Sequence, residues 1–437
     1  MIDLDRISPP DRRSNYLVVL RIDNARALEA AYGSDVLCAA VEHIRQGVEQ
    51  CLEPAEVVDV TTRGLTVLAH AAVIATDFVR TQVDELCLAL STSPLHYGEA
   101  DILLSISAGY SDPNEDGVDR HSTEAKWMAL RRLKGAVAPA LAVVPCNEHE
   151  EMRYRADMAI AAPLIMRHVA GETFFAWRPI FSPEDPSIVL RHEALLRYPG
   201  ERGEQFDCAR PYRALVRIGL AHLLDRLLVI RVLDELEADP EAELSIEIAL
   251  QSLSFDLCGQ DSAWTELMAR LEQKPELARR LVLEVHEATA HSPRDDTFTF
   301  LGVFRALGGR LSVAGFGSCS ASIREVARLR PDTLKLDSAF IRTAFSSGLS
   351  RARFADLVDL ARSLTAIVVA DGVETPDQWD IVAELGVQWI VGARRNRAST
   401  RRIWFNPVYD RLAADDLLEP PALNMEPVRR AAGTRRH

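Results

Sequence analysis

Eight strand-like runs follow one another between residues 173 and 392, and most of them are separated by helical stretches. Eight strand and helix units within about 240 residues are what an α/β barrel requires. The best-defined repeat lies in 310–337, where a helix opens with the capping-box pattern Ser322-x-x-Glu325 and Pro331 ends it. The sequence therefore predicts an α/β barrel. Its strands are predicted at Thr173–Ile180, Ile188–Tyr198, Leu244–Ala249, Leu281–Glu287, Arg310–Ala314, Thr333–Asp337, Ala366–Asp371 and Gln388–Gly392.

Charged side chains recur near the ends of these predicted strands. Glu193, Leu195 and Arg197 share one face of their strand, because strand side chains alternate with period two. A carboxylate suits a cation and a guanidinium suits a phosphate. A structural ion pair explains each charge taken alone, but recurrence on five strands favours a site at the barrel's C-terminal face. The recurring residues are Glu193, Arg197, Glu247, Glu284, Lys335, Asp337, Asp371 and Glu374.

The first part of the chain has a different pattern, in which short strands and helices alternate. We expect this part to form a small α/β sandwich. Strands are predicted at Tyr16–Ile22, Glu56–Val60, Leu65–His70 and Asp101–Tyr110, and helices at Ala25–Tyr32, Asp35–Cys51, Thr76–Leu90 and Thr123–Val137. The predicted organisation is a first domain at 1–145, a connector and lead-in helix at 146–170, the barrel at 171–410, and a disordered tail at 411–437 that is rich in Pro and Arg.

Composition narrows the class of protein. A chain of 437 residues exceeds one ordinary core, so two domains are expected. The net charge of −14 argues against a general nucleic-acid or anionic-membrane binder. The sequence contains no apolar run of about 20 residues and no signal peptide pattern, and its seven cysteines are scattered. These features predict a cytoplasmic protein with reduced thiols and no membrane span.

The barrel residues resemble the EAL family of cyclic-di-GMP phosphodiesterases over about residues 155 to 405. The family's name motif is matched fully by His192-Glu193-Ala194-Leu195-Leu196-Arg197. Trp177-Arg178-Pro179-Ile180, Leu283 to Glu287, Leu334 to Asp337 and Ala370 to Thr375 support the match. The resemblance implies a modified (β/α)8 TIM barrel, with Glu193 in a metal-binding role and Arg197 in a phosphate-binding role.

This sequence departs from the family at the positions that the resemblance assigns to metal binding. The Asp-Asp pair that bridges two divalent cations is Ala314-Gly315 here. Glu247 stands in place of an Asn ligand, Asp371 in place of a Glu, and Val391 in place of a Gln. Two-metal hydrolysis needs ions fixed a few ångströms apart. We therefore predict that the chain is not an enzyme.

The first domain resembles a GGDEF domain, the fold of diguanylate cyclases. Its signature hairpin would fall on Thr61 to Leu65, where no residue keeps the motif. Arg21 stands where the first metal-binding aspartate would be, and only Asp23 remains nearby. The resemblance therefore implies a degenerate GGDEF-like domain with a structural or dimerising role and no cyclase activity.

Ligand binding is predicted separately from catalysis. The candidate residues for binding cyclic-di-GMP are Arg178, Glu193, Leu195, Arg197, Lys335, Asp371 and Glu374. No cofactor is required, although one Mg²⁺ or Ca²⁺ on Glu193, Glu247 and Glu284 would relieve the repulsion between those carboxylates. His286 beside Glu284 suits a transition metal less well than it suits a hydrogen-bonded core position.

Three functions remain open at this point. The leading prediction is a catalytically inactive cyclic-di-GMP signalling protein whose barrel binds the nucleotide, a protein partner, or both. The alternatives are a protein-interaction scaffold without nucleotide binding and a residual phosphodiesterase with a rebuilt acidic site. The sequence names no protein partner, and it leaves a homodimer open.

Overall fold

The computed structural model describes residues 14–52, 55–71, 76–111, 129, 144–200, 204–253, 262–286, 295–318, 322–344, 346–392, 398–400 and 402. Apart from residue 129, the predicted helix Thr123–Val137 lies outside these ranges, as do Glu287, Cys319 and the tail at 411–437. The predictions made for those residues therefore stay predictions.

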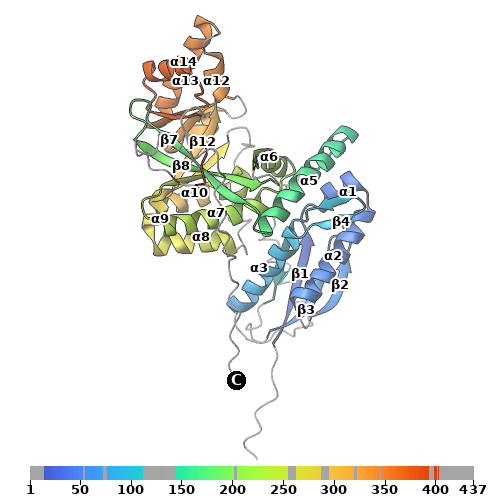
Figure 1. Cartoon of the computed structure of the whole chain (residues 1–437). Coiled ribbons are helices and arrows are strands. Elements are labelled where there is room, and N and C mark those ends of the chain that lie inside the picture. Colours follow the sequence, from blue (N-terminus) through green and yellow to red (C-terminus); the bar gives the residue numbers. More distant parts are fainter. Residues whose placement is uncertain are drawn as a thin grey trace, which may run out of the picture.

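The N-terminal unit is built on a four-stranded antiparallel sheet with the order β2-β3-β1-β6 (Figure 1). Strand β1, in the middle of this sheet, is apolar at the five consecutive positions 16–20, because both of its faces are covered. Tyr16, Val18 and Leu20 belong to the main core, and Leu17 packs on Leu68 on the other face. The strands are β1 (Ser14–Ile22), β2 (Ala55–Thr61), β3 (Gly64–Ala71) and β6 (Ile106–Tyr110), and the helices are α1 (Ala25–Tyr32), α2 (Asp35–Cys51) and α3 (Thr76–Thr92).

The prediction of a single strand over Asp101–Tyr110 is wrong. The segment divides into β5 (Ala100–Ile102), which pairs with β4 (Leu95–Tyr97), and β6. Between them, the buried Asn24 side chain donates to the Leu103 carbonyl and accepts from the Ser105 N–H, both at 3.0 Å. Because a side chain satisfies these backbone groups, they need no partner on a neighbouring strand, and the strand is interrupted between β5 and β6.

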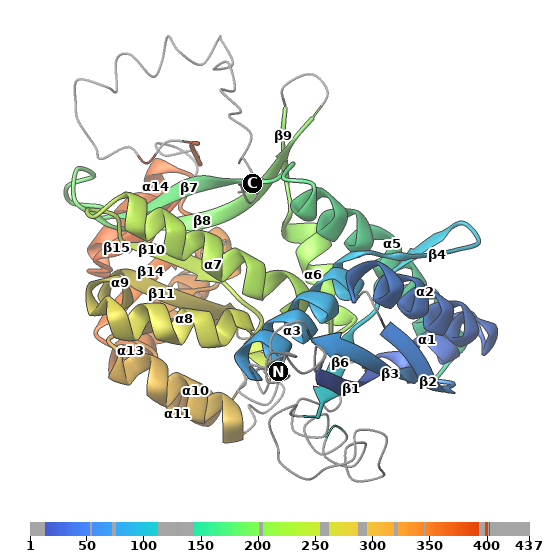
Figure 2. The same ribbon diagram turned by 90° about the horizontal axis from the view of Figure 1, so that it is seen from below.

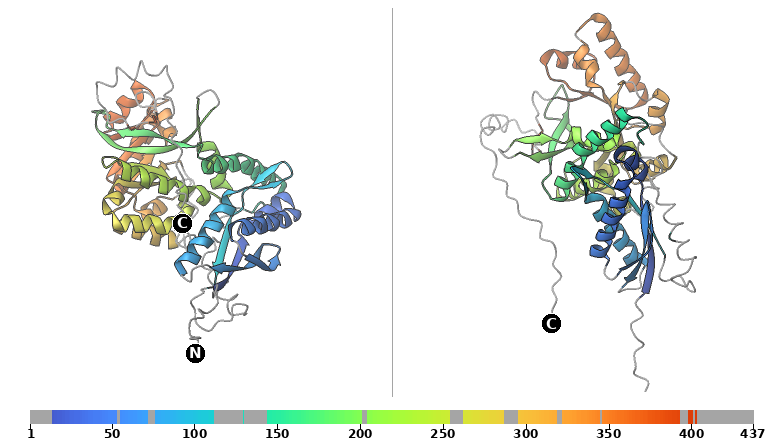
Figure 3. Two further views of the ribbon diagram at one scale, coloured as in Figure 1. Left: turned by 60° about the horizontal axis from the view of Figure 1, so that its bottom comes forward. Right: turned by 90° about the vertical axis from the view of Figure 1, so that its right-hand side faces the viewer.

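Helix α5 (Glu148–Val169) connects the two parts of the molecule (Figure 1, Figure 3). It begins after Asn147, whose side chain accepts a hydrogen bond from the Glu150 N–H at 3.0 Å. Its Met158 is buried in the core that both units share, and its Asp157 binds Arg217 of α6 (Ala209–Arg217). The N-terminal unit and the barrel therefore both pack against this helix.

The C-terminal part is a closed eight-stranded barrel, in which β8 pairs with β10 to complete the circle (Figure 2). Strand β7 runs antiparallel to its neighbours β8 and β15, and the remaining barrel pairs are parallel. The strands are β7 (Phe174–Phe181), β8 (Val189–Pro199), β10 (Leu244–Glu247), β11 (Leu281–His286), β12 (Arg310–Phe316), β13 (Thr333–Leu336), β14 (Ile367–Asp371) and β15 (Trp389–Val391). The predicted fold class is confirmed.

Helices cover the outside of the barrel between its strands. The predicted capping box of Ser322 and Glu325 is present at the start of α11, with both of its hydrogen bonds formed. The further helices are α7 (His222–Ala238), α8 (Ser262–Gln273), α9 (Pro275–Arg280), α10 (Asp295–Ala306), α11 (Ile323–Leu329), α12 (Ser338–Thr343), α13 (Gly348–Leu364) and α14 (Pro376–Glu384), with a 3₁₀ turn η1 (Leu250–Ser252) and an extra short strand β9 (Gln205–Asp207).

Among the helices in the described ranges, none is both long and apolar enough to cross a membrane. The cytoplasmic location stays a prediction.

Candidate functional site

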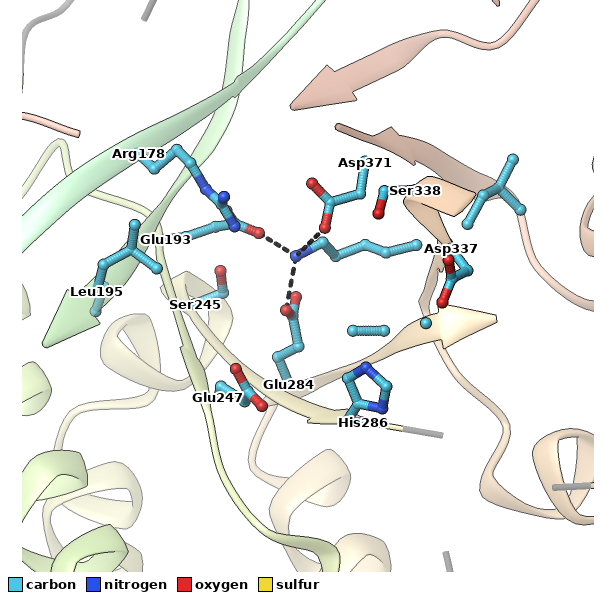
Figure 4. A pocket seen from close by; sticks show the side chains of 15 residues that line it. Arg178, Glu193, Leu195, Ser245, Glu247, Glu284, His286, Asp337, Ser338 and Asp371 are labelled. Atoms are coloured by element: carbon cyan, nitrogen blue, oxygen red, sulfur yellow. Dashed lines mark hydrogen bonds and ion pairs between the residues drawn. The ribbon is translucent and has the colours of Figure 1, made fainter. Parts of the chain in front are cut away.

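A cavity of about 150 Å³ opens at the C-terminal ends of the barrel strands (Figure 4). Five of the predicted ligand-binding residues line it, and so do the two other glutamates predicted to hold a metal. The predicted residues in the lining are Arg178, Glu193, Leu195, Lys335 and Asp371, together with Glu247 and Glu284. The structure therefore brings these seven residues together around one cavity, and their roles in binding stay predictions.

Lys335 of β13 lines this cavity and joins several of its acidic side chains. Its ammonium group forms ion pairs with Glu193 and with Glu284, the latter at 2.7 Å, and lies 3.9 Å from Asp371. The side chain is only 3% exposed. Burial favours the neutral amine, but the carboxylates outweigh it and raise the pKa of Lys335 above its usual value, so the lysine is charged.

Arg178 of β7 supplies a second cation to Glu193, with Nε 2.6 Å from the carboxylate. Burial alone would raise the pKa of Glu193, but Arg178 and Lys335 lower it to about 2. The antiparallel register places Arg178 opposite Glu193 on neighbouring strands. This acidic residue is thus ionised and bound by two cations from the chain itself.

Glu247 ends β10 on the water-exposed side of the cavity. Partial desolvation and the nearby Glu284 raise its pKa to about 7. The backbone after Glu247 is held by the buried Asp225 of α7. This carboxylate accepts hydrogen bonds from the Ala249 N–H at 3.0 Å and from the Tyr212 hydroxyl at 2.8 Å. The position of Glu247 therefore depends on a helix behind the strand.

The wall formed by β11 and β12 differs from the charged side. His286 of β11 lines the cavity beside Ala314 and Gly315 of β12, and neither of these two carries a polar side chain. Desolvation lowers the pKa of His286, so the imidazole is neutral at neutral pH. Beyond Glu284, which pairs with Lys335, this wall can offer hydrogen bonds but no further formal charge.

Two predicted ligand-binding residues lie outside the cavity lining. Arg197 forms an ion pair with Asp207 of β9 at 2.5 Å, because the end of β8 extends beyond the barrel and pairs with β9. The Glu374 side chain is exposed, on the loop that precedes α14. Their roles in binding stay predictions that this geometry does not support.

Ser245 is a cavity residue that the sequence reasoning missed. It is 1% exposed, it lines the cavity, and its hydroxyl has no hydrogen-bond partner among the described residues. A buried hydroxyl without a partner costs free energy unless water or a ligand satisfies it. The period-two spacing from Glu247 would have placed Ser245 on the same inward face.

The described carboxylates do not gather into a metal site in this arrangement. No group of three or more His, Cys, Asp and Glu residues suited to a metal ion is found in the described part of the chain. Glu193 and Glu284 converge on the Lys335 ammonium, which lies where a shared cation would have to lie. The side chains present therefore do not fit the divalent cations that the resemblance implies, and one Mg²⁺ or Ca²⁺ on Glu193, Glu247 and Glu284 stays an untested prediction.

The molecule is thus a closed α/β barrel with a cavity of acidic and basic side chains at the C-terminal ends of its strands, which is where barrel proteins carry their functional sites. The sequence profile of the EAL domain matches residues 165–394, more than half of the chain. The chain belongs to the EAL domain family.

Known proteins resemble this chain at low identity. MucR of Pseudomonas aeruginosa, a bifunctional diguanylate cyclase/cyclic di-GMP phosphodiesterase, is 25% identical over 315 residues, which cover 69% of this chain and 44% of MucR. NbdA of the same organism, a cyclic di-GMP phosphodiesterase, is 34% identical over 147 residues, covering 34% of this chain and 19% of NbdA. The chain thus spans less than half the length of either relative.

Two solved structures are also similar to this chain. The FimX EAL domain from Pseudomonas aeruginosa bound to c-di-GMP has a TM-score of 0.48 and 19% identity, covering 56% of this chain and 98% of that structure. The S helix-GGDEF-EAL structure of LapD from Vibrio cholerae has a TM-score of 0.47 and 16% identity, covering 86% of this chain and 88% of that structure.

The prediction that this chain is not an enzyme is contradicted by these comparisons. Several proteins that are similar to this chain are named cyclic di-GMP phosphodiesterases, although at low identity. The prediction rested on Ala314 and Gly315 in place of an Asp pair, on the substitutions at Glu247, Asp371 and Val391, and on the missing GGDEF motif at Thr61 to Leu65. Substituted positions do not by themselves remove a chain from a family of named phosphodiesterases, so we withdraw it.

Proposed function

We propose that the barrel binds cyclic-di-GMP in the cavity at its strand ends, and that the chain is a cyclic-di-GMP signalling protein. The observation that carries the proposal is the pair of cations, Arg178 and Lys335, held inside the cavity of an EAL barrel. The names of the relatives support the choice of nucleotide.

Arg178 is the residue that we expect to contact a phosphate group. Its Nε binds Glu193, but a guanidinium carries further N–H donors and matches the geometry of a phosphate. The side chain is 30% exposed at the mouth of the cavity, so a ligand can reach it. Lys335 is too deeply buried for that contact.

Lys335 has a different role in this proposal. Without a cation between them, the carboxylates of Glu193 and Glu284 would repel a dianionic ligand. The ammonium between the two carboxylates neutralises part of that charge within contact distance. The chain can therefore present a phosphate-binding arginine above two glutamates without a strong local negative potential.

For the N-terminal unit, we propose a GGDEF-like domain that transmits the state of the barrel to a protein partner or a second copy of the chain. The order of its helices and strands supports the domain type. The apolar core that it shares with α5 and the barrel supports a mechanical connection.

Calorimetric titration of the purified chain with cyclic-di-GMP tests the proposal. We expect saturable binding at one site, weakened about ten-fold or more in Arg178→Met through loss of a charged hydrogen bond. Arg351→Met is the matched control, because Arg351 lies on the outer helix α13 and pairs with Glu384. Its affinity should equal that of the native chain.

The same samples, analysed for linear pGpG, measure hydrolysis against a Glu193→Ala control. The absence of any binding by the native chain, with its fold intact, would reject the proposal in favour of the scaffold alternative. Product formation above the control would assign the nucleotide as a substrate.

A further inference from the structure

His286 and Gly315 form a matched pair at the ends of β11 and β12. The strands are parallel neighbours, and His286 pairs in register with Ala314, next to Gly315. A Cβ atom added to Gly315 would lie 2.5 Å from Cε1 and 2.7 Å from Nε2 of the imidazole. These distances are shorter than any tolerated carbon contact, so the ring can occupy its place only while residue 315 is glycine.

The backbone at Gly315 adds a second requirement for glycine. Its φ of +72° lies in the left-handed region, which side-chain-bearing residues rarely adopt. A substitution there would therefore both strain the strand end and displace the ring. The position of the imidazole therefore depends on the neighbouring strand β12 as well as on its own strand β11.

His286 lies across the cavity from Arg178 (Figure 4), on the wall formed by β11 and β12. Glu284 of the same strand and Asp337 also line the cavity there. Ala314 and Gly315 contribute no polar side-chain atom to this wall, whereas a neutral imidazole carries one N–H donor and one acceptor. A ligand phosphate that reaches across the cavity from Arg178 therefore meets the imidazole as the side-chain donor between β11 and β12.

We propose that His286 is a ligand-binding residue that donates a hydrogen bond to a phosphodiester oxygen of the bound nucleotide, and that Gly315 positions it. The inference rests on the proposed function, because it assigns a contact within the same cavity. It also explains why glycine stands at position 315, where the family resemblance implies an acidic residue. The room that the missing side chain leaves is filled by the ring.

Four variants test the inference by titration with cyclic-di-GMP in the presence of EDTA. We expect His286→Ala to weaken binding about ten-fold, the usual effect of losing one hydrogen bond to a charged group. His286→Gln keeps an N–H donor and should recover most of that loss. Gly315→Ala should weaken binding as much as His286→Ala, and the double variant should be no weaker than either single variant.

Gly171→Ala is the matched control for backbone strain. Gly171 has a φ of +75°, close to that of Gly315, but a Cβ added there would meet no atom within 4 Å. This variant should bind the nucleotide with native affinity. The inference is overturned if His286→Ala binds like the native chain, or if the effects of the two single variants add in the double variant.

A second measurement keeps the inference separate from the proposed function. The imidazole resonances of ¹⁵N-labelled protein, with His286 assigned through His286→Gln, are followed during titration with inorganic phosphate. We expect the His286 signals to shift. If the native chain binds no cyclic-di-GMP but these signals shift, the nucleotide assignment fails and the phosphate contact stands. If they do not shift in that case, both are rejected.

Discussion

Each of the two units carries ion pairs at the end of a strand, and the two sets of ion pairs differ in how deeply their side chains are buried. In the N-terminal unit, Arg21 binds Asp23 at 2.7 Å, and the arginine is 32% exposed. In the barrel, Lys335 binds Glu193 and Glu284, and all three side chains are less than a tenth exposed. The guanidinium of the first cluster is partly exposed to water, whereas every member of the second is buried, so we expect the barrel cluster to depend more strongly on each of its members.

The largest effect should come from Lys335→Met, which keeps the length of the side chain and removes its charge. Two carboxylates would then remain buried together, with Arg178 bound to only one of them. We expect the free energy of unfolding to fall by about 3–5 kcal/mol, as measured by urea denaturation. A loss below about 1 kcal/mol would show that the buried cluster behaves like a surface pair.

The second prediction concerns His222 of α7, whose Nε2 lies 3.2 Å from the hydroxyl of Ser105 in the N-terminal unit. Burial and then the nearby Arg226 lower the pKa of His222 from its usual 6.5 to about 3. Because the folded chain holds the neutral form, its stability is fully present above pH 6.5 and is lost as the pH falls towards 3.

In that range, this one residue should contribute a decrease of about 1.4 kcal/mol per pH unit. The difference in unfolding free energy between the native chain and His222→Gln, measured at several pH values, isolates the contribution. A difference that does not change between pH 7 and pH 4.5 would contradict the assignment of a buried neutral histidine between the units.

A third change, Asn24→Leu, removes the side chain that forms hydrogen bonds with the backbone between β5 and β6. The Leu103 carbonyl and the Ser105 N–H would be left buried without their partner. We expect a loss of about 2–3 kcal/mol in urea denaturation. Asn24→Asp keeps the acceptor for the Ser105 N–H, and it should lie between Asn24→Leu and the native chain.

The smallest effect should come from Arg21→Met in the N-terminal pair. An ion pair with one partly exposed member contributes about 1 kcal/mol or less, so the unfolding free energy should fall by no more than that. The difference between the losses of unfolding free energy in Arg21→Met and in Lys335→Met measures how much burial strengthens the dependence on an ion pair. Equal losses in the two variants would remove the distinction between the clusters.

The sequence was sufficient to predict the barrel and most of its cavity. Period-two alternation and strand ends place Glu193, Lys335 and Asp371 together, because parallel strands of a closed barrel end on one face. The same rule did not anticipate that Arg197 lies outside the cavity lining, since β8 has 11 residues and only its residues from His192 to Ala194 pair with β10. Where a strand leaves the barrel, its inward face no longer points at the cavity.

Contacts between distant segments could not be predicted. No local pattern shows that the ring of His286 needs glycine at position 315, or that Lys335 lies between two glutamates from other strands. The break in the strand at Leu103 depends on Asn24, 79 residues earlier in the chain. Such features depend on which side chains the fold brings together, and a single sequence does not record that.

A crystal structure of the chain grown with cyclic-di-GMP tests the central claim most directly. We expect the nucleotide across the strand ends of the barrel, with a phosphodiester oxygen within hydrogen-bonding distance of Arg178 and Lys335 still bound to Glu193 and Glu284. A nucleotide bound elsewhere on the molecule, or a cavity in which Lys335 has left both glutamates, would contradict the account.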